Sequence, residues 1–90
     1  MAWALYILRC ADGTLYVGST TDIDRRIAEH RSGQGGAYTR SRLPVRVVYR
    51  EAHPDRSAAQ RREAEIKAWP RASKLAFVRA ARTQRAMARA

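Results

Sequence analysis

The fold is decided at the start of the chain, by residues 3–18, WALYILRCADGTLYVG. Two runs rich in apolar and aromatic residues, 3–9 and 14–18, predict two β-strands. Between them, Ala11-Asp12-Gly13 predicts a tight turn, because glycine readily adopts positive φ. This stretch therefore predicts a β-hairpin.

A helix and a loop are expected next. Thr21 and Asp24 have the spacing of a capping box, which predicts a helix over residues 22–31. Residues 32–43 are polar and glycine-rich, which predicts a loop.

A third strand is predicted over residues 45–51. Apolar and polar residues alternate there, so we expect Val45, Val47 and Tyr49 on one face of the sheet.

Two helices complete the predicted fold. Ser57 is the expected cap of a helix that ends near Trp69, because Pro70 cannot continue it. Residues 71–83 predict a last helix, and residues 84–90 a basic tail for which we expect disorder. The order is β-β-α-β-α-α.

The fold class is α/β (α+β): a three-stranded, mainly antiparallel sheet flanked by helices. Ninety residues suffice for one small domain, expected over residues 1–83. No apolar run approaches membrane-span length, so we expect no membrane partner. The single cysteine, Cys10, cannot form an internal disulfide, and a cytoplasmic location is expected.

The charge of the chain is strongly positive, at +10. Sixteen of the 18 basic residues are arginine, and residues 46–90 carry twelve of the 18. Arginine matches phosphate groups with two parallel hydrogen bonds, so nucleic acid is the expected partner. The alternative is that the arginine and alanine content reflects a GC-rich genome.

Two ionisable residues lie on the stripe of the first predicted helix that should face the core. Ile23, Arg26, Ile27 and His30 have the i, i+3, i+4, i+7 spacing of one helix face, whereas Arg25 lies off it. Such conflicts tend to mark functional sites. The alternatives are an Arg26 whose stem covers the sheet edge and a His30 that favours the helix dipole.

Glu63 has a comparable position in the next helix. Ala59 and Ile66 flank it at −4 and +3, so it is predicted to face the packed side. Its alternative role is an i,i+4 ion pair with Lys67.

Tyr6 and Tyr16 fall in adjacent predicted strands, where tyrosine is most often a core residue with a hydrated hydroxyl. Gly18 would allow another chain or a phosphate to approach the backbone. A phenol, a guanidinium and a lone carboxylate in a basic chain together suggest phosphodiester chemistry.

These residues resemble the signatures of the GIY-YIG nuclease superfamily, in its small stand-alone bacterial UPF0213-type branch. Tyr16-Val17-Gly18 stands for the second motif, and Ala4-Leu5-Tyr6 for a degenerate first motif. Arg26 follows Tyr16 by ten residues, as the family's arginine does, and His30 follows four later. Glu63 stands where the family has its metal-binding glutamate.

The resemblance implies metal-dependent hydrolysis of DNA, with catalytic residues Tyr6, Tyr16, Arg26, His30 and Glu63. Glu63 would bind one Mg²⁺ or Mn²⁺ and Arg26 would hold the scissile phosphate. Tyr16 would position or deprotonate the attacking water, although Tyr6 and His30 could each be the base.

We expect further contacts with nucleic acid, which the resemblance implies is DNA, from Arg25, Tyr38, Arg40, Arg42, Arg62 and Lys67. A role in DNA repair or recombination rests on family analogy alone. The alternative function is a non-catalytic nucleic-acid-binding module, associated with DNA, RNA or the ribosome.

Overall fold

The computed structural model describes residues 2–89 and confirms the predicted order of elements, with one short helix added. The elements are β1 (Trp3–Arg9), β2 (Leu15–Thr20), α1 (Ile23–Arg31), α2 (Ala37–Arg40), β3 (Arg46–His53), α3 (Arg56–Lys67) and α4 (Arg71–Arg89). The added helix, α2, lies inside the segment that was predicted to be a loop.

The three strands form one antiparallel sheet in the order β2-β1-β3. The predicted hairpin is confirmed, and its turn is closed by the Cys10 amide donating to the Thr14 carbonyl over 2.9 Å. Gly13 in this turn has φ of 84°, which a glycine adopts without strain. The hairpin register places Tyr6 opposite Gly18.

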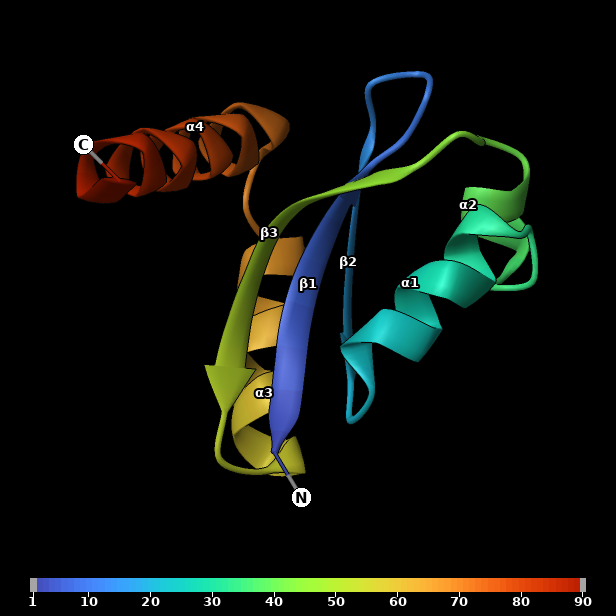
Figure 1. The fold of residues 1–90 in the computed structure, drawn as a ribbon, viewed down its shortest axis with the longest axis horizontal. Helices are drawn as coiled ribbons and strands as arrows, with labels where there is room; N and C mark the ends of the chain where they lie inside the picture. The colour runs from blue at the N-terminus through green and yellow to red at the C-terminus, as the bar shows by residue number, and fades with distance from the viewer. Residues whose placement is uncertain (1, 90) are drawn as a thin grey trace.

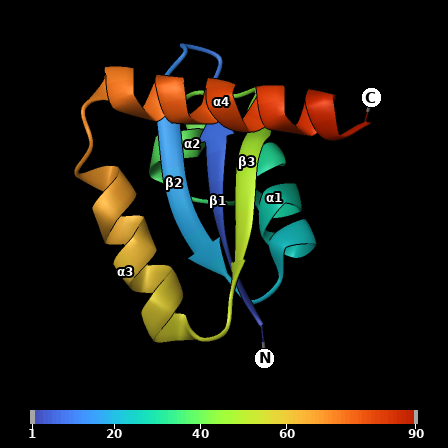
Figure 2. The same cartoon turned by 90° about the vertical axis from the view of Figure 1, so that its left-hand side faces the viewer.

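Helices cover both faces of the sheet, as Figures 1 and 2 show. On one face Ile66 of α3 and Val78 of α4 pack against Leu5 and Ile7 of β1. On the other face Ile27 of α1 packs against the alternate residues of β1, Tyr6 and Leu8. Helix α4 crosses the ends of the strands (Figure 2). Alternation along β1 thus assigns its side chains to two separate cores.

The predicted face of the third strand is wrong for one residue. Val45 and Val47 pack on the α1 side, but Tyr49 packs with the core on the α3 side. The cause is an irregularity of register: Leu8 pairs with Val47 whereas Ile7 pairs with Tyr49. Val48 is the extra residue, and such a β-bulge reverses the alternation of the residues beyond it.

The predicted helix caps are also corrected. Asp22, and not Thr21, caps α1, because its carboxylate accepts from the Arg25 amide at 3.1 Å. Asp55, and not Ser57, caps α3 by accepting from the Ala58 amide at 2.8 Å. Each cap lies three residues before the amide it binds.

The last helix is longer than predicted. Helix α4 runs to Arg89, beyond the expected end at residue 83, and so includes residues 84–89 of the expected tail. Residue 90 lies outside the described part of the chain. Across residues 2–89, no helix has both the length and the apolar character needed to cross a membrane.

Candidate active site

Two tyrosines and a histidine gather on the face of the sheet that α1 covers. Tyr6 and Tyr16 project from neighbouring strands with ring centroids 6.4 Å apart, and the His30 ring lies 5.1 Å from that of Tyr16. The hydroxyl of Tyr6 lies directly over Gly18, where a Cβ would be only 2.5 Å from it. Because Gly18 has no side chain, the Tyr6 ring can lie against its backbone. This makes close packing of the cluster possible.

A buried hydrogen-bonded chain runs through His30. Its Nε2 lies 3.0 Å from the Tyr6 hydroxyl, and its Nδ1 lies 2.8 Å from the Thr39 hydroxyl. His30 and Thr39 are 0% and 1% exposed, so water cannot replace either bond. A neutral imidazole has one donor and one acceptor nitrogen, so the hydrogen bonds at its two sides are coupled.

The two titratable members of this chain are held neutral. Burial and the charge of Arg26 lower the pKa of His30. Burial raises the pKa of Tyr6, and the Arg26 guanidinium only partly offsets this. Since a neutral histidine and a protonated tyrosine meet here, the proton stays on Tyr6 in the resting protein at neutral pH.

Arg26 lies at the border of the cluster, half-buried as the helix spacing predicted. Its side chain is 31% exposed, whereas that of the neighbouring Arg25 is 77% exposed. The Arg26 Nη2 donates to the Gly35 carbonyl over 2.8 Å, which links α1 to the segment before α2. The Arg26 Nη1 lies 3.9 Å from the Oε1 oxygen of Glu29. The guanidinium therefore lies beside Tyr6 and Tyr16, and its charge acts on both.

Glu63 lies on α3 beside the sheet edge formed by β2, where its charge helps to raise the pKa of Tyr6. Ala59 and Ile66 are fully buried beside Glu63, and its own side chain is 21% exposed, as the sequence predicted. One carboxylate oxygen accepts from the Ser19 hydroxyl at 3.1 Å, and the other lies 3.0 Å from the Lys67 ammonium. The ion pair with Lys67, the alternative role of Glu63, is thus present.

The donors around Glu63 suit a hard cation. A carboxylate and a hydroxyl are oxygen ligands of the kind that Mg²⁺ and Mn²⁺ prefer, with water completing the coordination. Among residues 2–89, no three His, Cys, Asp or Glu side chains are grouped to hold a metal ion. The Lys67 ammonium would have to leave the carboxylate, and its side chain is 53% exposed and free to do so.

The residues predicted to contact nucleic acid are divided between two places. Tyr38 lies in the tyrosine cluster, 5.8 Å from the Tyr16 ring, and the Arg42 guanidinium stacks on it at 3.9 Å. Arg40 is exposed nearby. Arg62, by contrast, is held on the other side of the sheet by Glu51, at 2.9 Å.

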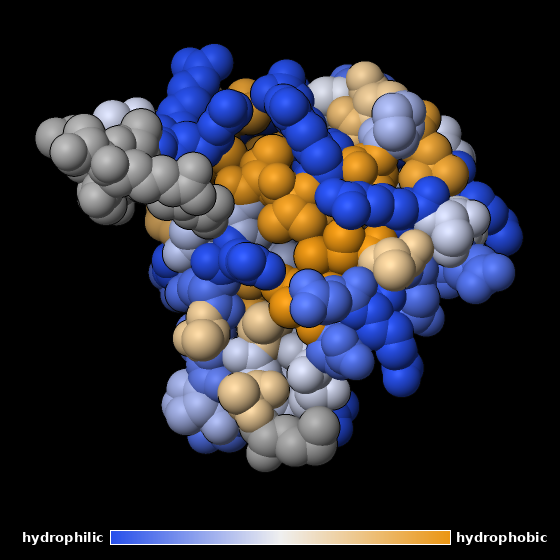
Figure 3. Space-filling view, viewed as in Figure 1, coloured by the Kyte–Doolittle hydropathy of each residue, from blue (hydrophilic) through white to orange (hydrophobic). Residues whose placement is uncertain are grey.

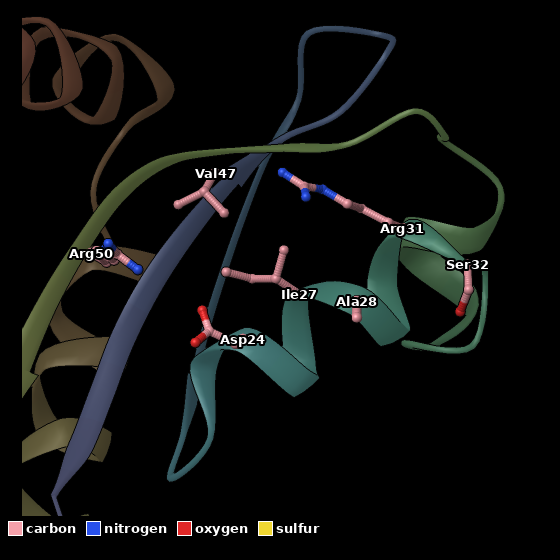
Figure 4. A pocket seen from close by; sticks show the side chains of 7 residues that line it. All are labelled: Asp24, Ile27, Ala28, Arg31, Ser32, Val47 and Arg50. Carbon is pink, nitrogen blue, oxygen red and sulfur yellow. The ribbon is translucent and has the colours of Figure 1, made fainter.

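A separate hollow of about 820 Å³ lies between α1 and β3. Its floor is apolar and its rim hydrophilic, as Figures 3 and 4 show. None of the predicted catalytic residues lines it; the lining side chains are Asp24, Ile27, Ala28, Arg31, Ser32, Val47 and Arg50.

The sequence predictions missed two residues of this site, Thr39 and Ser19. Ser19 could have been found, because strand alternation puts it on the same face as Val17, toward α3. Thr39 was not assigned to the site, because its contact with His30 depends on α2, which lies in a segment expected to be a loop.

Comparison with known proteins assigns the class of this fold. Residues 2–76 match the sequence model of the GIY-YIG catalytic domain, so the chain belongs to the GIY-YIG family. The proteins that it resembles include members named UPF0213. It is 48% identical over 82 residues to a UPF0213 protein of Streptococcus sanguinis, covering 91% of this chain and 93% of that protein. It is 53% identical over 70 residues to one of Natronomonas pharaonis, covering 78% and 82%.

Two solution structures agree with this assignment. The UPF0213 protein of Bacillus halodurans is 47% identical, with a TM-score of 0.58 over 87% of this chain and 83% of that one. A protein of E. faecalis is 35% identical, with a TM-score of 0.62 over 92% and 88%.

Proposed function

We propose that this protein is a divalent-metal-dependent endonuclease that hydrolyses phosphodiester bonds in DNA. The observation that carries the proposal is the convergence of Tyr6, Tyr16 and His30 beside Arg26. The match to the catalytic-domain model includes all three strands of the sheet. A role in DNA repair or recombination is the biological context that the family suggests.

Arg26 is the residue proposed to hold the scissile phosphate. Its helix is anchored by Ile27 and His30, and its bond to the Gly35 carbonyl fixes the direction of the guanidinium. A fixed donor of this kind stabilises the negative charge that develops in the transition state without further reorganisation.

Tyr16 is the proposed partner of the attacking water. It is half-buried, whereas Tyr6 is 1% and His30 0% exposed, so Tyr16 is the most accessible of the three candidates. Tyr6 and His30 support it by their own hydrogen bond and by packing against its ring. Proton transfer by a positioned side chain or water contributes typically about 10²–10⁴-fold to rate.

Glu63, with the Ser19 hydroxyl beside it, would hold the Mg²⁺ or Mn²⁺ ion. A bound divalent cation supplies positive charge that stabilises the leaving oxygen and the phosphate. Lys67 neutralises the carboxylate in the metal-free protein and would pair with the DNA backbone when displaced.

The same ion pair favours a second candidate function. Because Lys67 occupies one oxygen of Glu63 and Ser19 the other, the carboxylate is satisfied without a metal. A non-catalytic nucleic-acid-binding module would keep this arrangement. Salt-sensitive binding without cleavage in Mg²⁺ or Mn²⁺ would favour that function.

Adjacent arginines provide a matched test. Nicking of supercoiled plasmid at saturating protein would be compared for wild type, Arg26→Gln and Arg25→Gln. Loss of a charge clamp typically costs about 10²–10³-fold in rate, and we expect this for Arg26→Gln alone. Equal rates in all three would contradict the proposed role. Unfolding of Arg26→Gln, seen by circular dichroism, would assign Arg26 to packing instead.

A further inference from the structure

Helix α4 crosses the ends of the strands (Figure 2). Three arginines belong to the elements at this crossing. Arg9 of β1 and Arg46 of β3 are direct cross-strand partners. Strand alternation directs both toward the α4 side, since their neighbours Leu8 and Val47 pack on the α1 side. Arg82 of α4 lines a hollow of about 150 Å³ together with Arg46. We call Arg9, Arg46 and Arg82 the strand-end arginines.

The strand-end arginines have no carboxylate partner among residues 2–89. Every acidic residue of the chain is placed elsewhere, and α4 contains none. Five carboxylates form ion pairs with other residues: Asp12, Glu29, Glu51, Glu63 and Glu65.

The other three acidic residues also have positions or partners elsewhere in the structure. Asp22 and Asp55 cap helices α1 and α3. Asp24 lines the hollow between α1 and β3.

This arrangement is unfavourable in the free protein. Like charges placed directly opposite each other on neighbouring strands destabilise a sheet. A third positive charge from α4 adds to that repulsion, and an anion bound between them would remove it. Arginine is suited to this task, because its guanidinium binds phosphate with two parallel hydrogen bonds.

We propose that the strand-end arginines form a second phosphate-binding site, for the backbone of a nucleic acid outside the segment that is cut. That the anion is nucleic acid rests on the proposed function. Tyr6, Tyr16 and His30 lie on the opposite face of the sheet. Glu63 is bonded to Ser19, which pairs with Leu5, four residues along β1 from Arg9. In this proposal the site holds a second part of the same molecule, such as a duplex arm.

The test measures binding without cleavage. A fluorescent 16-base-pair duplex is titrated at 50–200 mM KCl in the presence of chelator. The proteins compared are wild type and the double variant Arg9→Gln/Arg46→Gln. The matched control is Arg56→Gln/Arg61→Gln, which removes the same charge from exposed arginines of α3. Each lost phosphate contact makes the slope of log Kobs against log[KCl] shallower by about 0.9. We expect the strand-end variant to be shallower by about 1.8 and Arg82→Gln by about 0.9. The control should match wild type.

Equal slopes for the two double variants would overturn the proposal, because net charge alone would then explain binding. Loss of binding to phosphatidylglycerol vesicles with unchanged duplex binding would overturn it as well, in favour of a lipid surface. This binding measurement does not depend on cleavage. A protein that shows these slopes but does not cut DNA would contradict the proposed function and would still support the phosphate site.

Discussion

Replacing Thr39 with valine tests whether the buried chain Tyr6–His30–Thr39 holds the site together. Valine keeps the shape of threonine but removes the hydroxyl, which lies 2.8 Å from His30 Nδ1. Both residues are at most 1% exposed, so no water can take its place. A buried polar atom left without a partner costs about 1–3 kcal/mol.

The expected loss of stability is therefore large for a chain of this size. A loss of about 2 kcal/mol lowers the Tm of a small domain by about 8–16 °C. Thermal unfolding followed by circular dichroism at pH 7.5 measures this. The control, Thr39→Ser, keeps the hydroxyl and loses one methyl group, which costs about 1 kcal/mol.

A second readout separates the hydrogen bond from packing. The ¹⁵N chemical shifts of the His30 imidazole report which nitrogen carries the proton. We expect Thr39→Val to change them and Thr39→Ser to preserve them. The reasoning is refuted if Thr39→Val is as stable as wild type and leaves the His30 shifts unchanged.

Two further predictions concern the same cluster. Because burial and Arg26 hold the folded-state pKa of His30 below its unfolded value, the unfolded state binds more protons below about pH 6.5. Stability to urea should therefore fall between pH 7.5 and 5.5, and an equally steep fall in His30→Gln would contradict this. Gly18→Ala should cost about 1–3 kcal/mol, because the new Cβ displaces the Tyr6 ring and its bond to His30. A midpoint of urea unfolding equal to that of wild type would show that the ring is free to move.

The sequence was sufficient to predict the strands of the hairpin, the order of the elements and the two helix faces that carry Arg26 and Glu63. These features depend on local spacing: period two in the strands and i, i+3, i+4 in the helices. Ile27 and Ile66 are buried as this spacing requires, and Arg26 and Glu63 are half-buried beside them.

Features that depend on contacts between distant segments were not predictable in this way. The bulge at Val48 follows from how β3 pairs with β1, so the alternation of β3 alone placed Tyr49 on the wrong face. The partnership of Ser19 with Glu63 joins residues 44 apart in sequence. The predicted helix caps were wrong for a different reason. Near the start of each helix, a hydroxyl and a carboxylate were both acceptable as the cap.

The central claim is that Glu63 makes this protein a metal-dependent nuclease. The most direct measurement is the single-turnover rate of DNA cleavage as a function of Mg²⁺ or Mn²⁺ concentration, for wild type, Glu63→Gln and Glu65→Gln. Glu65 lies on the same helix but is 56% exposed and pairs with Arg62, so it is the matched control. The account predicts metal-dependent cleavage by wild type and Glu65→Gln, and a rate for Glu63→Gln no higher than that in chelator. Wild-type cleavage by Glu63→Gln, or no cleavage by any of the three proteins, would contradict it.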